Sequence, residues 1–152
     1  CFMHWFPSII SFLLVMLSIN GIAQQTEPIV IQVAANQFYQ STGLALIKGE
    51  TYEITAVGEW QDASFPPSDA NGFKGFTAPM FFGMLLKPMP RQYYMKLCGK
   101  VGGWKFPIGT ATTITIKRNG ELLLYANDAK GFFDNNSGTL KVTIKKLNES
   151  EN

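Results

Sequence analysis

One stretch near the C-terminal end of the chain combines residue types that bind hard cations. Asp128 directly follows an apolar strand-like run, and Asn135 and Asn136 precede the next such run. A turn between two strands would bring one carboxylate and two side-chain amides to the same end of a sheet. Calcium suits such a set because it accepts roughly 6–8 oxygen ligands in irregular geometry. The alternative is a turn in which the Asp and Asn side chains hydrogen-bond their own backbone.

Alternating apolar and polar residues dominate the rest of the chain, and no amphipathic helical pattern is longer than two turns. The strands expected from this alternation are Pro28–Ala34, Leu44–Ile47, Thr51–Val57, Tyr93–Cys98, Thr112–Lys117, Leu122–Ala126 and Thr139–Lys146. About eight short antiparallel strands with tight turns predict an all-β fold, a small antiparallel β-sandwich.

Two tight turns are expected to form hairpins within this sandwich. Lys48-Gly49-Glu50 separates the second and third expected strands, and Asn119-Gly120 precedes Leu122–Ala126. Asn-Gly is the strongest short hairpin signal. The segment Asp62–Arg91 is instead long and rich in Pro, Gly, Phe and Met. It is either a binding loop on a rigid scaffold or a loop that packs its own aromatic side chains.

The first 23 residues predict a bacterial signal peptide that begins at Met3. An apolar run, Ile9–Leu17, is followed by Gly21 and Ala23, the small residues that a signal peptidase reads. The run is short for a membrane span, although a retained anchor is the alternative. We therefore expect residues 1–23 to be removed, residues 24–152 to form one domain, and the protein to be secreted or periplasmic without membrane contact after cleavage.

Composition excludes several classes of function. The 152 residues carry a net charge of only +2 with acids and bases interspersed, so there is no basic stripe for nucleic acid. His4, the one histidine, lies in the expected leader, which removes His-based nucleophiles and the usual zinc sites from the domain. Cys98 is then alone and is expected to be a buried small hydrophobe. The carboxylates form no recognisable glycosidase pair, so we do not expect an enzyme.

The segment Asn127–Gly138 resembles the calcium loop of the bacterial galactophilic lectin (PA-IL-like) family. The shared pattern is a strand with Tyr, Asn-Asp, a short loop, Asn-Asn-Ser-Gly and a strand. Lys48–Ile54, Gly58-Glu59-Trp60 and Met95–Gly102 resemble other parts of the family in the same order. In that family the fold is a small, galactose-binding-domain-like β-sandwich, and calcium bridges the protein to vicinal sugar hydroxyls. The resemblance thus implies a lectin-like, metal-binding module with Ca²⁺ as cofactor and a glycan or monosaccharide as partner.

The resemblance also implies roles for particular residues. Carboxylate oxygens would come from Asp128, side-chain carbonyls from the two asparagines and backbone carbonyls from two other positions, with Asp62 as an option beside the first. The implied calcium ligands are Ala63, Asp128, Phe132, Asn135 and Asn136. The implied sugar contacts are Asp128, Ala129, Asn135 and Asn136.

The chain departs from the galactose-binding prototype in the long loop, where the prototype holds its sugar with a histidine and a glutamine. Neither residue type occurs between Asp62 and Arg91, so galactose specificity is not carried over. Aromatic residues of this loop could stack on a sugar ring or pack within the loop. They are Phe65, Phe73, Phe76, Phe81 and Phe82.

Three questions stay open at this point. One carboxylate leaves a calcium site formally positive, so neutral hydroxyls or an anionic ligand could fill the remaining positions, and Asp134 would lower the charge if it turned inward. A structural or interaction sandwich that has lost sugar binding is the competing hypothesis. Related lectins assemble to gain avidity, so a homo-oligomer is the third open question.

Overall fold

The structure is a computed structural model that describes residues 27–63 and 65–147. Within them eight strands and three short helical segments follow one another. The strands are β1 (Ile29–Ala34), β2 (Gln40–Leu46), β3 (Thr51–Asp62), β4 (Leu97–Val101), β5 (Trp104–Pro107), β6 (Ala111–Thr115), β7 (Gly120–Ala126) and β8 (Asn136–Leu147). The helical segments are α1 (Ala78–Gly83) and the 3₁₀ turns η1 (Met84–Leu86) and η2 (Phe133–Asn135).

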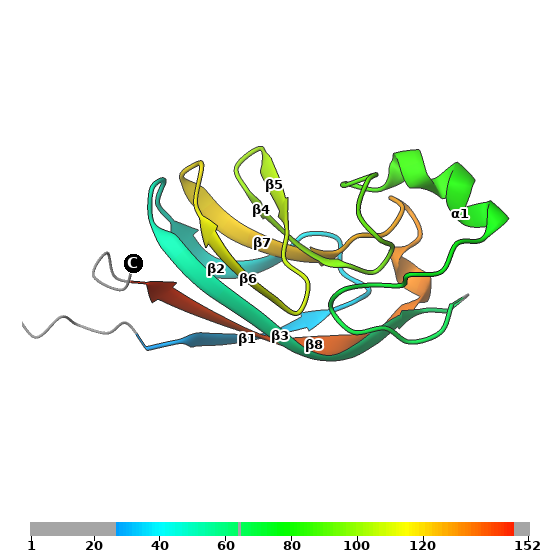
Figure 1. Ribbon diagram of the computed structural model, residues 1–152, viewed down its shortest axis with the longest axis horizontal. Helices are drawn as coiled ribbons and strands as arrows, with labels where there is room; N and C mark the ends of the chain where they lie inside the picture. The colour runs from blue at the N-terminus through cyan, green and yellow to red at the C-terminus, as the bar shows by residue number, and fades with distance from the viewer. Residues whose placement is uncertain (1–26, 64, 148–152) are drawn as a thin grey trace, which may run out of the picture.

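The strands form two antiparallel four-stranded sheets, and the predicted β-sandwich is confirmed (Figure 1). One sheet has the order β1-β8-β3-β6 and the other the order β2-β7-β4-β5. The longest pairing joins β3 to β8 over twelve residues, from Thr51 opposite Leu147 to Asp62 opposite Asn136. This pair therefore has two ends far apart in space, and each end carries a polar cluster.

Alternation places one face of each long strand in the core, as the sequence predicted. Ile54 in β3 and Leu140 and Val142 in β8 are fully buried between the sheets. Trp60, near the end of β3, is 1% exposed and donates its Nε1–H to the carbonyl oxygen of Met95 at 2.6 Å. That bond satisfies the indole, which would otherwise be a costly polar group in an apolar interior.

Both hairpin predictions are wrong. β2 pairs with β7 while β3 pairs with β8 and β6, so the turn at Gly49 carries the chain from one sheet to the other. The Asn119-Gly120 turn does the same between β6 and β7. The turn residues were read correctly, but turn chemistry specifies a reversal and not the neighbour that a strand pairs with. Among the described strands, only β4 and β5 form a consecutive pair.

The strand expected over Tyr93–Cys98 begins only at Leu97. Before it, Met95 has a positive φ of 60° and turns the chain away from strand geometry. Met95 is buried in the core, and its backbone oxygen is the Trp60 partner, so tertiary packing overrides the local alternation. Cys98 is buried and free, as expected, and burial raises the pKa of its thiol to about 12.

The long 62–91 segment lies at one end of the sandwich, where α1 projects beyond the strand ends (Figure 1). The hydroxyl of Tyr94 ties this helix to the sandwich by donating to the carbonyl oxygen of Met80 at 2.7 Å. No helix in residues 27–63 and 65–147 is long and apolar enough to cross a membrane. The expected signal peptide lies outside the described residues.

Candidate functional site

The ends of three strands converge beside the 62–91 segment. Asp62 is the last residue of β3 and lies opposite Asn136, the first residue of β8. Asp128 comes two residues after the end of β7, and η2 carries Asn135 into β8. The structure therefore brings the predicted residues Asp128, Asn135 and Asn136 together with Asp62. We call these four residues the acid–amide cluster.

Asn136 and Asp128 form the buried half of this cluster. Asn136 donates from Nδ2 to Asp128 Oδ2 at 2.8 Å and to the carbonyl oxygen of Ala35 at 3.3 Å. The backbone N–H of Ala129 donates to Asp128 Oδ1 at 2.7 Å. Asn136 Oδ1 is buried and accepts no hydrogen bond from any described residue. A buried carbonyl oxygen without a donor costs free energy, so this atom calls for a partner such as a cation.

Asp62 and Asn135 form the other half. Asn135 donates from Nδ2 to Asp62 Oδ1 at 3.1 Å, while the N–H of Ala63 donates to the carbonyl oxygen of Asn135 at 3.2 Å. Asp62 is only 6% exposed. Among the described residues Asp62 lines the adjoining cavity and Ala63 does not. Of the two neighbouring candidates at the end of β3, Asp62 therefore faces the cavity and Ala63, the expected backbone ligand, does not.

The electrostatics of the cluster favour a guest cation. Asp128 is 1% exposed, and burial raises the pKa of its carboxyl, with the nearby charge of Asp62 adding to the rise. Hydrogen bonds from Asn136 and Ala129 act in the opposite direction. Two carboxylates in a shielded region stabilise a positive charge placed between them and are destabilised without one.

Lys87 is the nearby cationic side chain, but it is engaged elsewhere. Its Nζ donates to the carbonyl oxygen of Gln92 at 2.5 Å and lies 4.1 Å from the centroid of the Tyr94 ring. Burial lowers the pKa of Lys87, although the charges of Cys98 and Asp128 oppose this. Lys87 therefore acts on Asp128 through its charge, while its ammonium is held by the Gln92 carbonyl oxygen and the Tyr94 ring.

The donor set fits calcium and not a transition metal. Residues 27–63 and 65–147 hold no group of three or more His, Cys, Asp or Glu that could bind a metal. The cluster instead offers carboxylate and amide oxygens, which are the ligands that hard cations such as calcium prefer. The buried Asn136 Oδ1 is the observation that carries this fit.

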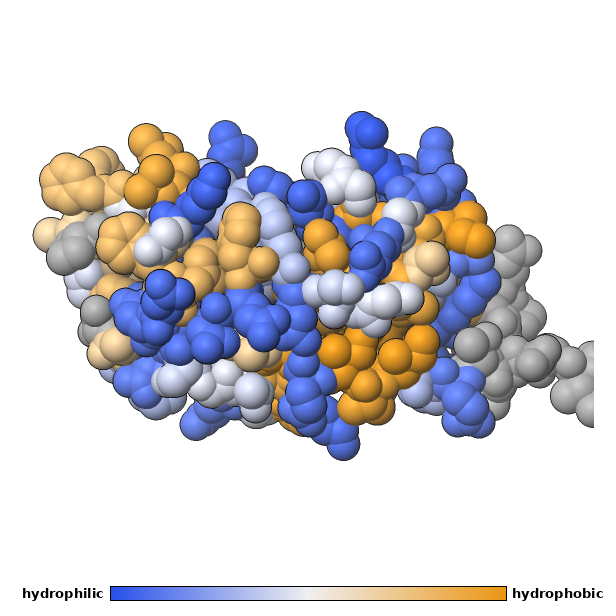
Figure 2. Space-filling model, turned by 180° about the vertical axis from the view of Figure 1, so that it is seen from behind, coloured by the Kyte–Doolittle hydropathy of each residue, from blue (hydrophilic) through white to orange (hydrophobic). Residues whose placement is uncertain are grey.

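A cavity of about 560 Å³ opens onto the cluster. Its polar wall contains Asp62, Asp128 and Asn135, and much of the rest is apolar. The remaining lining residues are Phe65, Thr77, Met80, Phe82, Gly83, Leu86, Tyr94, Ala129 and Phe132. Viewed from behind, hydrophobic side chains gather at the end of the molecule that carries α1 (Figure 2). The cavity thus joins an oxygen-rich site to an apolar surface, as ligand pockets commonly do.

The two other predicted site positions lie in the loop between β7 and η2. Ala129 is 4% exposed and lines the cavity beside Asp128. Phe132 donates its N–H to the carbonyl oxygen of Ala129 at 3.0 Å, and its 57%-exposed ring lines the cavity. Asp134 in η2 is exposed and does not line the cavity, so its carboxylate has not turned inward to lower the charge of the site.

The aromatic residues of the long segment divide into two groups. Phe65 and Phe82 line the cavity, and Phe73 stacks on Phe65 with ring centroids 5.2 Å apart. Phe76 and Phe81 are 71% and 57% exposed and do not line it. Packing within the loop, one of the two roles expected from the sequence, therefore occurs between Phe65 and Phe73, and stacking on a sugar ring stays a prediction.

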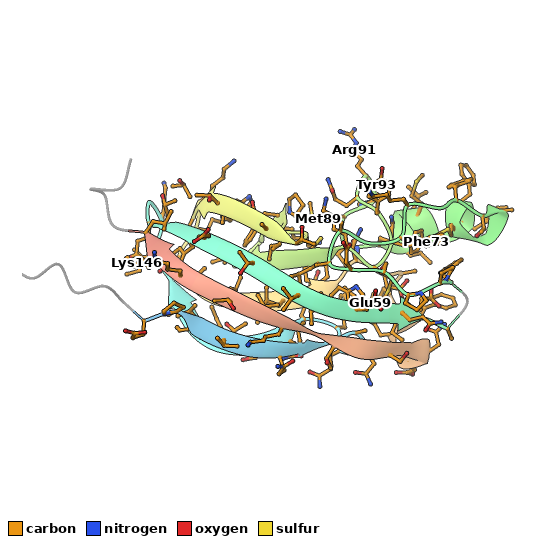
Figure 3. All side chains as sticks on the ribbon, turned by 60° about the horizontal axis from the view of Figure 1, so that its bottom comes forward. Glu59, Phe73, Met89, Arg91, Tyr93 and Lys146 are labelled. Atoms are coloured by element: carbon orange, nitrogen blue, oxygen red, sulfur yellow. The ribbon has the colours of Figure 1, made fainter. Side chains whose placement is uncertain are left out.

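Asn127 holds the loop before β4, a role that sequence reasoning missed. Its Oδ1 accepts the N–H of Met89 at 3.0 Å, and its Nδ2 donates to the carbonyl oxygens of Met89 at 2.9 Å and Tyr93 at 3.1 Å. Figure 3 shows Met89, Arg91 and Tyr93 gathered in this loop. Asn127 is fully buried, so the asparagine before Asp128 is structural. A buried Asn at a strand end was the only signal that could have indicated this.

Comparison with known proteins gives one line of evidence. No family model matches the chain, and no curated protein matches it. Among solved structures, one described as "EclA N-terminal domain; PllA-like lectin" is similar, with a TM-score of 0.60 and 21% sequence identity. The match covers 78% of this chain and 95% of that one. At this identity the likeness establishes a shared lectin-like sandwich fold.

Proposed function

We propose that this protein is a calcium-dependent carbohydrate-binding module that acts by coordination and not by catalysis. The observation that carries the proposal is the buried Asn136 Oδ1, which lacks a donor and belongs to a cluster with a buried carboxylate. The named lectin with a similar fold supports the carbohydrate part. The export expected from the sequence would place the module in the periplasm or outside the cell, where free glycans and millimolar calcium occur.

The cluster residues and two backbone groups would bind the metal, and the metal would bind the sugar. Asp128 supplies carboxylate oxygens, and the amides of Asn135 and Asn136 supply carbonyl oxygens. The backbone carbonyl of Phe132 and a group at the end of β3, Ala63 or Asp62, complete the protein shell. When bound, calcium offers open coordination positions to vicinal hydroxyls. Bonds from Asn136 Nδ2 and the Ala129 N–H fix the Asp128 carboxylate, so little side-chain entropy is lost on binding.

The sugar would lie in the cavity beside the metal. Asp128, Ala129 and Asn135 line it and could contact hydroxyls. Asn136 does not line the cavity and is hydrogen-bonded to Asp128. Phe82 or Phe65 could cover an apolar ring face, because sugar C–H groups pack on aromatic rings. The galactophilic specificity of the resembling family is not part of this proposal, and neither is a particular oligomer.

Thermal unfolding of the full chain with excess calcium and then with a chelator tests the proposal. A ligand that binds only the folded state raises the midpoint by mass action, by about 2.7 kcal/mol of stability at a hundredfold excess over Kd. We expect a rise that Asp128→Asn abolishes. A rise followed by no binding on a broad glycan array would favour the structural sandwich, and no rise at all would refute the metal site.

A further inference from the structure

The acid–amide cluster contains one more carboxylate than its resemblance to calcium lectin loops implies. Asp62 and Asp128 both line the cavity, and both are almost fully buried, at 6% and 1% exposed. They come from different strands that meet only in the folded state, since Asp62 ends β3 and Asp128 follows β7.

A second observation, an unpartnered buried oxygen, points to a ligand at the cluster. Asn136 Oδ1 is buried without a donor, directly across the β3–β8 ladder from Asp62. Asn135, the other amide, is held by Asp62 Oδ1 at 3.1 Å. Asp62 is therefore hydrogen-bonded to Asn135, and its side chain lines the same cavity as that of Asp128. It can give an oxygen to a cation or orient Asn135 toward one.

The number of carboxylates beside the metal decides which class of ligand the site attracts. A divalent ion beside Asp128 alone would leave one positive charge, which would attract acidic sugars. With Asp62 included, the two carboxylates balance the ion, and a negative ligand gains no net attraction. Lys87 is not a member of the cluster: its ammonium donates to the carbonyl oxygen of Gln92 and lies over the Tyr94 ring, and it acts on Asp128 through its charge.

We infer that Asp62 is the second anionic group of the calcium site, so that the loaded site is formally neutral and selects uncharged polyhydroxy ligands over acidic ones. This inference rests on the proposed function. It goes beyond it by assigning Asp62 a role in metal affinity and by naming neutral sugars as the ligand class. Asp134, which would have lowered the charge if it turned inward, is exposed and does not line the cavity.

Calorimetric titration of calcium chloride into four versions of the full chain tests the assignment. Asp62→Asn keeps the side-chain oxygen that accepts from Asn135 but removes the charge, and we expect a loss of calcium affinity of about 10- to 100-fold. Asp128→Asn should abolish binding. Asp134→Asn is the matched control: it removes the same charge from an exposed position nearby and should change the affinity by less than about threefold because water screens it.

Thermal unfolding separates this role from a structural one. In chelator, Asp62→Asn should unfold at the same temperature as the unmutated chain or higher, because one of two repelling carboxylates is gone. In excess calcium it should unfold at a lower temperature. A residue that merely supported the fold would lower both midpoints, and that result would overturn the inference.

Ligand selection gives the last readout. On an array that carries neutral and uronic- or sialic-acid glycans, the unmutated chain should favour neutral glycans, and Asp62→Asn should gain signal on acidic ones. Calcium binding that Asp128→Asn abolishes but Asp62→Asn leaves unchanged overturns the role of Asp62 while the proposed function stands. An absence of calcium binding in the unmutated chain refutes both.

Discussion

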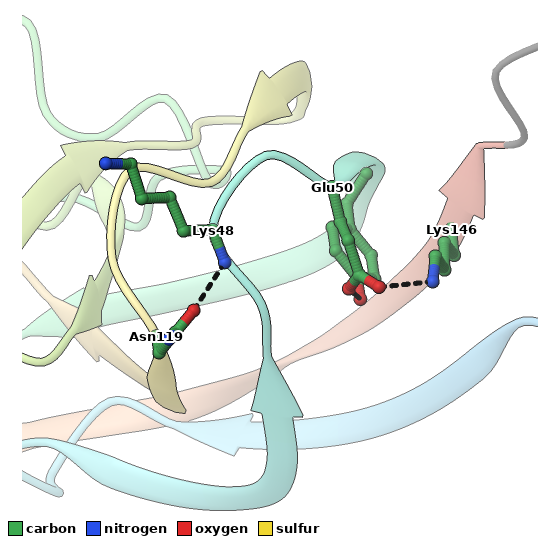
Figure 4. A network of polar contacts seen from close by, with 5 residues as sticks. Lys48, Glu50, Asn119 and Lys146 are labelled. Carbon is green, nitrogen blue, oxygen red and sulfur yellow. Dashed lines mark hydrogen bonds and ion pairs between the residues drawn. The ribbon is translucent and has the colours of Figure 1, made fainter.

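The two ends of the β3–β8 pair place their carboxylates in opposite environments, one paired with a lysine at the surface and the other buried. At one end Glu50 forms an ion pair with Lys146 (Figure 4). It also accepts a hydrogen bond from the Tyr52 hydroxyl at 2.6 Å. These bonds, from Lys146 first and Tyr52 second, hold the pKa of Glu50 below its usual range. At the other end burial raises the pKa of Asp128. Figure 3 shows Lys146 at the first end and Glu59 and Phe73 toward the second.

The comparison separates a charge that is paired within the fold from two charges that are shielded from water. Glu50 pairs with an opposite charge, Lys146, in the same chain, and both side chains are partly exposed to water. The pair therefore contributes to the stability of the fold and needs no ligand. Asp62 and Asp128 are shielded from water and lie beside an amide oxygen that has no donor. A chain that keeps such an arrangement pays for it in stability unless a ligand compensates, as functional sites generally do.

The largest effect is expected at Gly138, where β8 crosses Trp60. Its φ is +87°, and an added Cβ would lie 2.7 Å from the backbone oxygen of Glu59 and 2.8 Å from the Trp60 Cα. We expect Gly138→Ala to destabilise by about 3 kcal/mol or more, since backbone must move as well as adopt a strained φ. Denaturant unfolding measures this.

Gly131, in the loop between β7 and η2, supplies the control. Its φ is +92°, but an added Cβ would meet nothing within 4 Å. Gly131→Ala should therefore cost only the left-handed strain, about 1–2 kcal/mol. Equal losses for the two variants would mean that close packing at Gly138 contributes nothing. The difference also assigns the glycine of the Asn-Asn-Ser-Gly motif to packing against β3 and not to cation binding.

The next effect compares one asparagine at each end. Asn127 is fully buried and bonds both backbone polar groups of Met89, whereas Asn119 is exposed and accepts only the N–H of Lys48 at 2.7 Å (Figure 4). Asn127→Ala should destabilise by about 2–3 kcal/mol, because it strands buried donors and acceptors. Asn119→Ala should cost about 0.5 kcal/mol, because water replaces the lost bond.

Urea midpoints of the two variants, with unchanged slopes, would give these differences. If both cost the same, burial does not distinguish the two ends in the way argued above. Asn127→Ala should also loosen the 89–93 loop, which hydrogen exchange at Met89 would detect as faster exchange.

The sequence predicted the parts of this molecule that depend on local pattern. Alternation identified the buried faces of β3 and β8, and the spacing of Asp128, Asn135 and Asn136 indicated residues that share one end of the sandwich. It failed where pairing is non-local. Gly49 and Asn119-Gly120 mark reversals, but which sheet receives the returning strand depends on packing across the whole core.

The same limit explains why Asp62 was only an option beside Ala63. Its side chain joins the cluster because β3 runs on past Val57 to residue 62, directly opposite the start of β8. Local alternation favoured a strand that stops at Val57, since Gly58 and the exposed Glu59 interrupt the apolar pattern. The long β3–β8 ladder, and not the residues around Asp62, carries that carboxylate to Asn135 and Asn136.

The smallest effect is expected from the surface pair Glu50–Lys146. Because the folded-state pKa of Glu50 is lowered, its contribution is present above the unfolded-state pKa, near 4.5, and is lost as pH falls through the lower folded-state value. Both side chains are partly exposed, so screening limits the pair to about 0.5 kcal/mol. Lys146→Gln should therefore lower stability slightly at pH 7 and leave it unchanged at pH 2. Unfolding midpoints at the two pH values measure this, and a loss as large as that of Asn127→Ala would show that this end depends on its charges as strongly as the other end depends on its buried amide.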